Sequence, residues 1–135
     1  MSVDPGPFDL TETRLVMGPH GDATPKAISP AFYAELDAEF DHFAGHVLLS
    51  EHAFEEHWSS WEMHPKGDEI VYLIEGDVDF VLWIEGGERT LRVDRPGSYV
   101  VVPKGTWHTA RPRRPTRMLF LTPGEGTRHG DHPGR

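Results

Sequence analysis

Two stretches of sequence decide the fold of this chain: Glu62-Met-His-Pro-Lys-Gly-Asp-Glu69, which continues to Gly76, and Gly97-Ser-Tyr-Val-Val-Val-Pro-Lys-Gly-Thr-Trp-His108. Each stretch combines glycine and proline residues, which turn β-strands, with side chains that bind metal ions. The metal-binding side chains are Glu62, His64, Glu69 and His108. Carboxylates and imidazoles are common ligands of divalent transition metals, so the two stretches predict a small β-protein with one metal site.

Strand signals continue on both sides of these stretches. Short segments rich in β-branched and aromatic residues alternate with Gly and Pro turn signals. We expect strands at residues 14–17, 46–50, 58–64, 69–74, 77–84, 89–93, 98–102, 107–110 and 118–122. Residues 29–40 predict a helix, with Ser29 as the N-cap and Pro30 in its first turn. This pattern predicts an all-β fold, either a closed barrel or a double-sheet jelly roll.

The same two stretches resemble the two sequence motifs of the cupin superfamily. The first motif reads G-x5-H-x-H-x3,4-E-x6-G, and its second half fits His64, Glu69 and Gly76. The second motif reads G-x5-P-x-G-x2-H-x3-N and fits from Gly97 to His108. The chain departs from these motifs at three positions, where Glu62 replaces the first His, Glu56 the first Gly and Pro112 the final Asn.

The resemblance implies a double-stranded β-helix, or jelly-roll barrel, over residues 45–123. Residues 1–44 are then an N-terminal arm with one short helix, and the polar residues 124–135 are expected to be a flexible tail. Cupins often pair through strands and arms of this kind, so the resemblance also implies a homodimer.

Strand periodicity supports the metal site independently of the resemblance. Side chains at positions i and i+2 of a strand share one face, so Glu62 and His64 should point the same way. Glu69 opens the next strand, and His108 comes from a distant one. These four side chains in an apolar interior need a cation or a shared proton network, because burying an unpaired carboxylate costs free energy.

Two interpretations of these four residues therefore stay open. In the first they bind one divalent transition metal ion, Fe, Mn, Zn or Ni, and Glu62 shifts the preference toward ions that accept oxygen ligands. In the second no metal binds: Glu62 pairs with His64, Glu69 takes a proton, and His108 forms a hydrogen bond in the interior.

Residues beside the motifs are weaker candidates. Tyr99, Trp107 and Trp58 are expected to line a pocket next to the metal site. No catalytic acid or base is assigned by a motif, although Tyr99, His57 and Glu51 have suitable side chains. Three other histidines, His42, His46 and His52, are expected at the surface or in packing. The basic segment 111–117 is either a solvated loop or an anion-binding rim.

Composition narrows the functional classes. A hydrophobic content of 37% suits one globular core, and no apolar run is long enough for a membrane-spanning helix. The formal net charge of −9 argues against nucleic acid as a partner. The absence of cysteine and of a visible signal sequence predicts a cytoplasmic protein.

The function expected from these observations is metal-dependent chemistry on a small oxygen-bearing molecule. The cupin resemblance permits dioxygenases, isomerases and lyases, and enzyme activity is slightly favoured. The alternative is a binding or sensing module that holds a sugar or carboxylate without turnover. A storage-like barrel is the third possibility, and it would leave the polar interior without a use.

Overall fold

The computed structural model describes residues 4–134, so the first three residues of the expected arm and Arg135 of the expected tail lie outside it. The chain is mainly β-sheet, with one α-helix and one short 3₁₀ helix. The strands are β1 Thr13–Met17, β2 Ala23–Ala27, β3 Val47–Phe54, β4 Trp61–Met63, β5 Glu69–Ile84, β6 Gly87–Val93, β7 Tyr99–Val102, β8 His108–Thr122 and β9 Arg128–Gly130. The helices are α1 Phe32–Glu39 and η1 Asp41–Phe43. The predicted all-β class with one short helix is confirmed.

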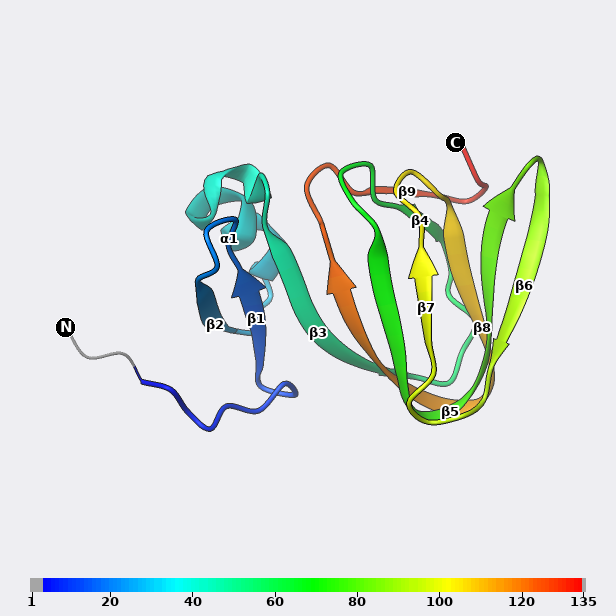
Figure 1. Cartoon of the computed structure of the whole chain (residues 1–135), viewed down its shortest axis with the longest axis horizontal. Coiled ribbons are helices and arrows are strands. Elements are labelled where there is room, and N and C mark those ends of the chain that lie inside the picture. The colour runs from blue at the N-terminus through cyan, green and yellow to red at the C-terminus, as the bar shows by residue number, and fades with distance from the viewer. Residues whose placement is uncertain (1–3, 135) are drawn as a thin grey trace.

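Two long strands organise the sheet. β5 and β8 pair antiparallel along most of their length, and both bend at the base of the molecule to run up its other side (Figure 1). The strand order is β2-β1-β3-β8-β4-β9, while β5 also pairs with β6 and β7. Within residues 4–134 these pairings form one bent sheet that does not close into a continuous barrel, so of the two expected forms the double-sheet jelly roll fits the structure.

The bends explain why the sequence predicted more strands than the structure contains. The expected strands 69–74 and 77–84 are both parts of β5, and 107–110 and 118–122 are both parts of β8. Gly76 suggested a turn, but it lies where the β5–β8 register shifts, and Pro112 and Pro115 of β8 lie at or beside the same irregular stretch. Proline is tolerated at such irregular sites because no regular ladder hydrogen bond is lost there.

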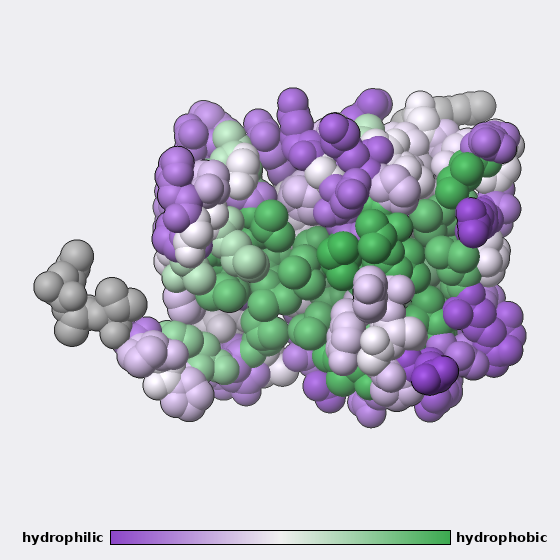
Figure 2. Space-filling view, in the orientation of Figure 1, coloured by the Kyte–Doolittle hydropathy of each residue, from purple (hydrophilic) through white to green (hydrophobic). Residues whose placement is uncertain are grey.

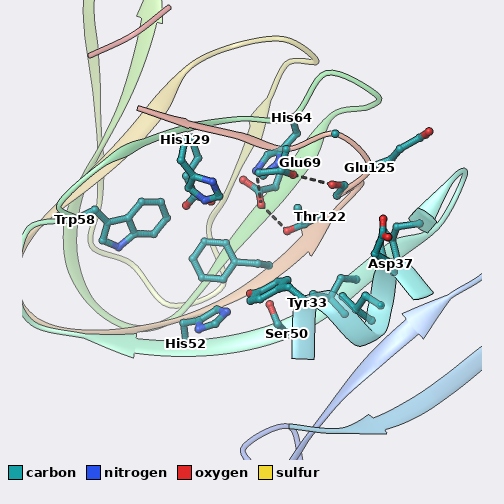
Figure 3. A pocket seen from close by; sticks show the side chains of 18 of the residues that line it. Tyr33, Asp37, Ser50, His52, Trp58, His64, Glu69, Thr122, Glu125 and His129 are labelled. Atoms are coloured by element: carbon teal, nitrogen blue, oxygen red, sulfur yellow. Dashed lines mark hydrogen bonds and ion pairs between the residues drawn. The ribbon is translucent and has the colours of Figure 1, made fainter. Parts of the chain in front are cut away.

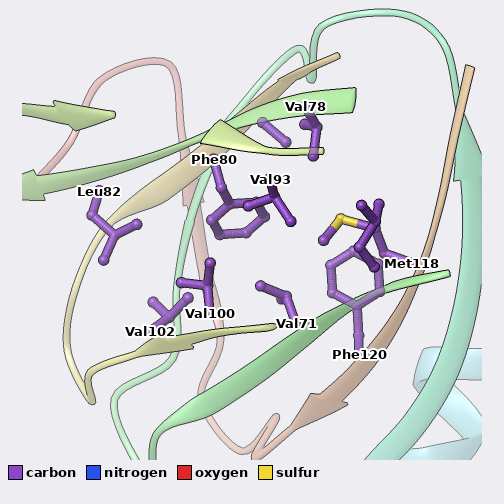
Figure 4. Packing of buried hydrophobic residues seen from close by; sticks show 11 residues of the cluster. Val71, Val78, Phe80, Leu82, Val93, Val100, Val102, Met118 and Phe120 are labelled. Atoms are coloured by element: carbon purple, nitrogen blue, oxygen red, sulfur yellow. The ribbon is translucent and has the colours of Figure 1, made fainter. Parts of the chain in front are cut away.

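The main hydrophobic core lies between the two sides of the bent sheet. It contains inward-facing residues of β5, β6, β7 and β8, including Val71, Phe80, Val100 and Met118 (Figure 4). Alternation within β7 is clear, because Val100 and Val102 are buried while Tyr99 and Val101 are exposed. The core therefore fixes which face of each strand points inward.

The N-terminal residues add a second, smaller core. The β1–β2 hairpin extends the sheet next to β3, and α1 packs on it through Phe32 and Leu36. The helix begins at Phe32 rather than near Ser29, whose hydroxyl donates to Glu35 2.5 Å away instead of capping the helix. This packing places α1 beside one end of the cupped sheet (Figure 1).

Two further expectations differ from the structure. The expected strand 58–64 is reduced to β4, which pairs with β9 from the segment expected to be a flexible tail. The basic segment lies within β8, and its side chains form ion pairs on the outer surface, among them Arg111–Glu88, Arg113–Asp79 and Arg117–Glu51. It is therefore neither a solvated loop nor an unpaired rim. Over residues 4–134, no helix has the length and apolar character needed to cross a membrane.

Candidate metal centre and adjoining cavity

Three of the four predicted ligands meet in the interior. His64 follows β4, Glu69 opens β5 and His108 opens β8. The Nε2 atom of His108 lies 3.1 Å from Oε1 of Glu69, and Nε2 of His64 lies 3.3 Å from Oε2 of the same carboxylate. All three side chains are buried, and one potential ligand atom from each lies within 4.8 Å of the others. The arrangement has the residue types and spacing of a metal site.

Hydrogen bonds orient both imidazoles in the same sense. Nδ1 of His108 lies 3.1 Å from the carbonyl oxygen of Thr106, which can only accept. Nδ1 of His64 lies 2.9 Å from the hydroxyl of Thr127, and that hydroxyl donates its proton to the carbonyl of Gly124. Each Nδ1 must therefore donate, which leaves each Nε2 with its lone pair facing Glu69. Such outer hydrogen bonds are how proteins fix the ligating tautomer of histidine.

Within residues 4–134, the atoms at the centre of the group find no hydrogen-bond partner. Nε2 of His64, Oε1 of Glu69 and Nε2 of His108 are all buried, and none of their mutual contacts has hydrogen-bond geometry. The other carboxylate oxygen of Glu69 accepts a hydrogen bond from Thr122. Buried unpaired polar atoms are rare and costly, so three that face one another indicate a place for a cation. The residues therefore fit a divalent metal ion.

Without a metal, protons must supply this positive charge. Burial alone would raise the pKa of Glu69, but His108 and His64 outweigh it and lower the pKa to about 2. Burial alone would lower the pKa of His108, but Glu69 outweighs it and raises the pKa. These directions of the two pKa values favour an ionised Glu69 carboxylate beside His108 over the metal-free interpretation in which Glu69 takes a proton.

Glu62 does not join the group. It shares the cavity wall with His64, as strand alternation predicts, but its Oε2 lies 3.3 Å from Nε2 of His129. The register of the short strands explains this, because Glu62 of β4 lies opposite His129 of β9. The predicted four-residue set therefore reduces to three in the structure, and the predicted Glu62–His64 pair is replaced by Glu62–His129.

A cavity of about 650 Å³ adjoins the three residues. His64 and Glu69 reach its wall (Figure 3), whereas His108 does not line it and stacks against Phe80. Phe54, Trp58 and Phe120 form an aromatic side of the cavity, with ring centroids 5.6 and 5.9 Å apart. A space of this size suits a small organic molecule.

The structure places only one of the predicted pocket residues at the cavity. Trp58 lines it, but Tyr99 lies on the outer face of β7 and is 63% exposed. Trp107 packs instead in a separate cluster with Trp61, Met63 and Val81. The suggested acid–base groups Tyr99, His57 and Glu51 do not line the cavity, and Glu51 is paired with Arg117.

His52 is a cavity residue that the sequence analysis placed at the surface or in packing. It packs edge-on against Phe120, with ring centroids 5.4 Å apart. Burial lowers its pKa, assisted by the charge of Arg14. Alternation along β3, with Leu48, Ser50 and His52 all lining the cavity, carries the signal that could have found it, but the expected strand ended at residue 50.

Comparison with known proteins identifies the family. Residues 51–124 match the cupin domain, which is more than half of the chain. The chain belongs to the cupin family. The resemblance seen in the two motifs is thereby confirmed.

Solved structures show the same fold at low sequence identity. An oxalate oxidase aligns with a TM-score of 0.50 at 18% identity, over 60% of this cupin and 44% of that chain. The oxalate decarboxylase of Bacillus subtilis, described with Mn(II) centres, aligns with a TM-score of 0.51 at 18% identity, over 62% of this cupin and 23% of that chain. This cupin thus spans less than half of either protein. No curated protein matches its sequence significantly.

The pKa shifts predict how the stability of the metal-free protein depends on pH. The pKa of Glu69 is lower in the folded protein than in the unfolded chain. Its contribution to the free energy of unfolding is therefore present above the unfolded pKa of 4.5 and is lost as the pH falls toward about 2. The folded pKa of His108 is raised, so its contribution is full below the unfolded value of 6.5 and is lost as the pH rises through the folded value. Together the two groups contribute most to the free energy of unfolding between pH 4.5 and pH 6.5, the pKa values of the two groups in the unfolded chain.

We therefore expect chelator-treated protein to gain stability from this pair at about pH 5.5 and to lose part of it at about pH 8. A bound metal should reverse this trend, because metal ligation requires neutral imidazoles. The pKa of His52 is lowered where that of His108 is raised, so His52 changes the stability with pH in the opposite direction. Melting curves of His108→Gln measure this background, and the difference from the unaltered protein reports on His108. An identical pH dependence in this variant and the unaltered protein would contradict the assignment.

Proposed function

We propose that this cupin binds one divalent transition metal ion through His64, Glu69 and His108 and uses it to act on a small oxygen-bearing molecule in the cavity. The observation that carries the proposal is the set of three buried, unpaired ligand atoms facing one another. Both imidazoles already present Nε2 as the ligating atom. A bound metal would supply Lewis-acid or oxygen-activating chemistry at this wall of the cavity.

Two imidazoles and one carboxylate suit iron well, and manganese, zinc and nickel also accept these ligands. A set of three protein ligands leaves coordination positions for a substrate, which favours an enzyme of the dioxygenase, isomerase or lyase class over a module that only binds. The residues of this chain would then hold the metal, orient the substrate against the aromatic wall and limit the access of water.

The test is elemental analysis of protein purified without added metal and without a metal-affinity column. We expect close to one transition metal ion per chain in the unaltered protein and in Glu62→Gln, but almost none in Glu69→Gln. Loss of metal in Glu62→Gln would instead restore the four-residue set. A metal-free protein that stays empty after incubation with iron, manganese, zinc and nickel would overturn the proposal and favour the binding module.

We also propose that the protein is a homodimer, through the outer face of the sheet. The strand register aligns a row of apolar residues across five strands, Leu15, Leu49, Leu121, Ile70 and Val101. Tyr99 and Val101 at one end of it are 63% and 46% exposed. Figure 2 shows a hydrophobic band crossing this side of the molecule. Contiguous apolar surface of this kind is typical of an interface, and light scattering that gives the mass of a monomer would reject the dimer.

A further inference from the structure

The ionisable side chains around the cavity are unbalanced in charge. Four carboxylates line it, from Asp37, Glu62, Glu69 and Glu125. Within residues 4–134, no lysine or arginine lines it, and the remaining ionisable groups there are imidazoles and the Tyr33 phenol. Glu69 is 3% exposed, and its Oε1 has no hydrogen-bond partner among residues 4–134. At least one of these negative charges is therefore buried in the interior of the protein.

Arginines do lie outside the cavity wall. Arg14 packs over the ring of Phe32 and donates a hydrogen bond to the Tyr33 hydroxyl, and its charge acts on His52. Arg111, Arg113 and Arg117 of β8 each pair with a carboxylate on the outer surface of the sheet. Proteins that bind carboxylates or phosphates usually supply arginine, lysine or helix N-terminal amides. Among residues 4–134 no guanidinium or ammonium group lines the cavity, and even a bound divalent cation would leave the charge of its four carboxylates in excess of the metal charge.

Part of the cavity wall is apolar. Phe54, Trp58 and Phe120 pack edge-on or tilted against one another, and Leu48 and Phe43 continue the surface toward α1. Such a wall favours burial of an apolar ring or chain, at about 25 cal/mol for each Å² removed from water. This wall adjoins the metal group, because the ring of Trp58 lies 6.4 Å from that of His108. A ligand packed against the wall can therefore also bring a polar oxygen to His64 and Glu69, which reach the cavity (Figure 3).

We propose that the cavity selects an uncharged or cationic organic molecule with a ring-sized apolar part, and that it discriminates against carboxylate substrates, including dianions such as oxalate. This inference rests on the proposed function, since it names the substrate class of the same site. It separates this cupin from the oxalate-converting proteins that share its fold, because charge at the cavity, not the fold, sets which substrates enter.

The test compares three probes that share one ring and differ in charge: benzyl alcohol, benzylammonium and benzoate. Binding is measured by NMR titration of the Trp58 indole N–H, assigned with Trp58→Phe, at about pH 8, where an ordinary imidazole is neutral. We expect benzyl alcohol and benzylammonium to bind at least about 10-fold more tightly than benzoate, a difference of about 1.4 kcal/mol. Oxalate should compete with none of the three.

The acidic lining is tested with the double variant Asp37→Asn/Glu125→Gln, which leaves the metal group intact. We expect it to bind benzoate several-fold more tightly relative to benzyl alcohol. The matched control is Glu12→Gln/Asp94→Asn, which removes the same charge from positions outside the cavity and should preserve the preference. An equal change in both double variants would overturn a local role for the lining.

All titrations are repeated on chelator-treated and metal-loaded protein, so that the two proposals can fail separately. Failure to bind metal would reject the metal centre but leave the charge preference measurable in the chelator-treated protein. Benzoate or oxalate binding as tightly as benzyl alcohol, in either state, would overturn the substrate class. Binding of none of the three ring probes at millimolar concentration would overturn the apolar part of the inference.

Discussion

We expect His108→Ala to lose its metal ion and most of the metal-dependent stability of the protein. With metal at about 1,000 times its dissociation constant, binding adds about 4 kcal/mol to the free energy of unfolding, because the ion binds only the folded state. His108 is fully buried and its ring stacks on Phe80 at 5.7 Å, so no other side chain can take its place without repacking the core. The measurement is the melting temperature of parent and variant, each with and without added metal.

The comparison with and without metal is needed because truncation of a buried ring is destabilising by itself. Removing a large buried side chain costs about 3 kcal/mol in many cores, whether or not a metal is present. Only the increase in melting temperature on adding metal reports on ligation, and we expect it to disappear in His108→Ala. The matched control is His57→Ala, an exposed histidine outside the cavity, which should keep the full increase. A metal-dependent increase in His108→Ala equal to that of the parent would exclude His108 as a ligand.

The parts of the site that were predictable from sequence are those set by local spacing. Glu69 and Gly76 lie on one strand, and His64 lies one short turn before it, so their separation in sequence determines their separation in space. His108 lies opposite Leu82 of the same long strand, at the start of β8. Regular strand geometry is therefore the reason that the group of His64, Glu69 and His108 could be predicted from the sequence.

The parts that were not predictable depend on contacts between distant segments. His129 pairs with Glu62 only because β9 adds to β4, and a three-residue strand in a polar tail has no periodic signal of its own. Thr127 fixes the tautomer of His64 from the same tail. The residues that α1 brings to the cavity, among them Tyr33 and Asp37, depend likewise on helix packing that the sequence pattern does not specify.

Gly76 connects the fold to the metal centre. It lies at the bend of β5, where the strand leaves the side of the sheet that carries Glu69 and enters the side that carries Phe80. Its φ of 129° is a conformation that residues with a Cβ rarely adopt. Thr116 of β8 packs against it and is 2% exposed, while its hydroxyl accepts a hydrogen bond from the backbone N–H of Asp77. The bend is thus tightly packed against the partner strand.

We expect Gly76→Ala to lower the free energy of unfolding by about 3 kcal/mol or more, because it combines backbone strain with a steric clash. A Cβ built at Gly76 would lie 2.6 Å from the Cα of Thr116, and this backbone atom cannot move without displacing β8. Gly105→Ala is the matched control, since Gly105 also has a positive φ, 78°, but apart from its chain neighbours no atom of residues 4–134 lies within 4 Å of its added Cβ. It should cost only about 1 kcal/mol, the strain term alone. Denaturant unfolding measures both, and equal losses would show that the close packing of Gly76 against Thr116 does not constrain the bend that positions Glu69.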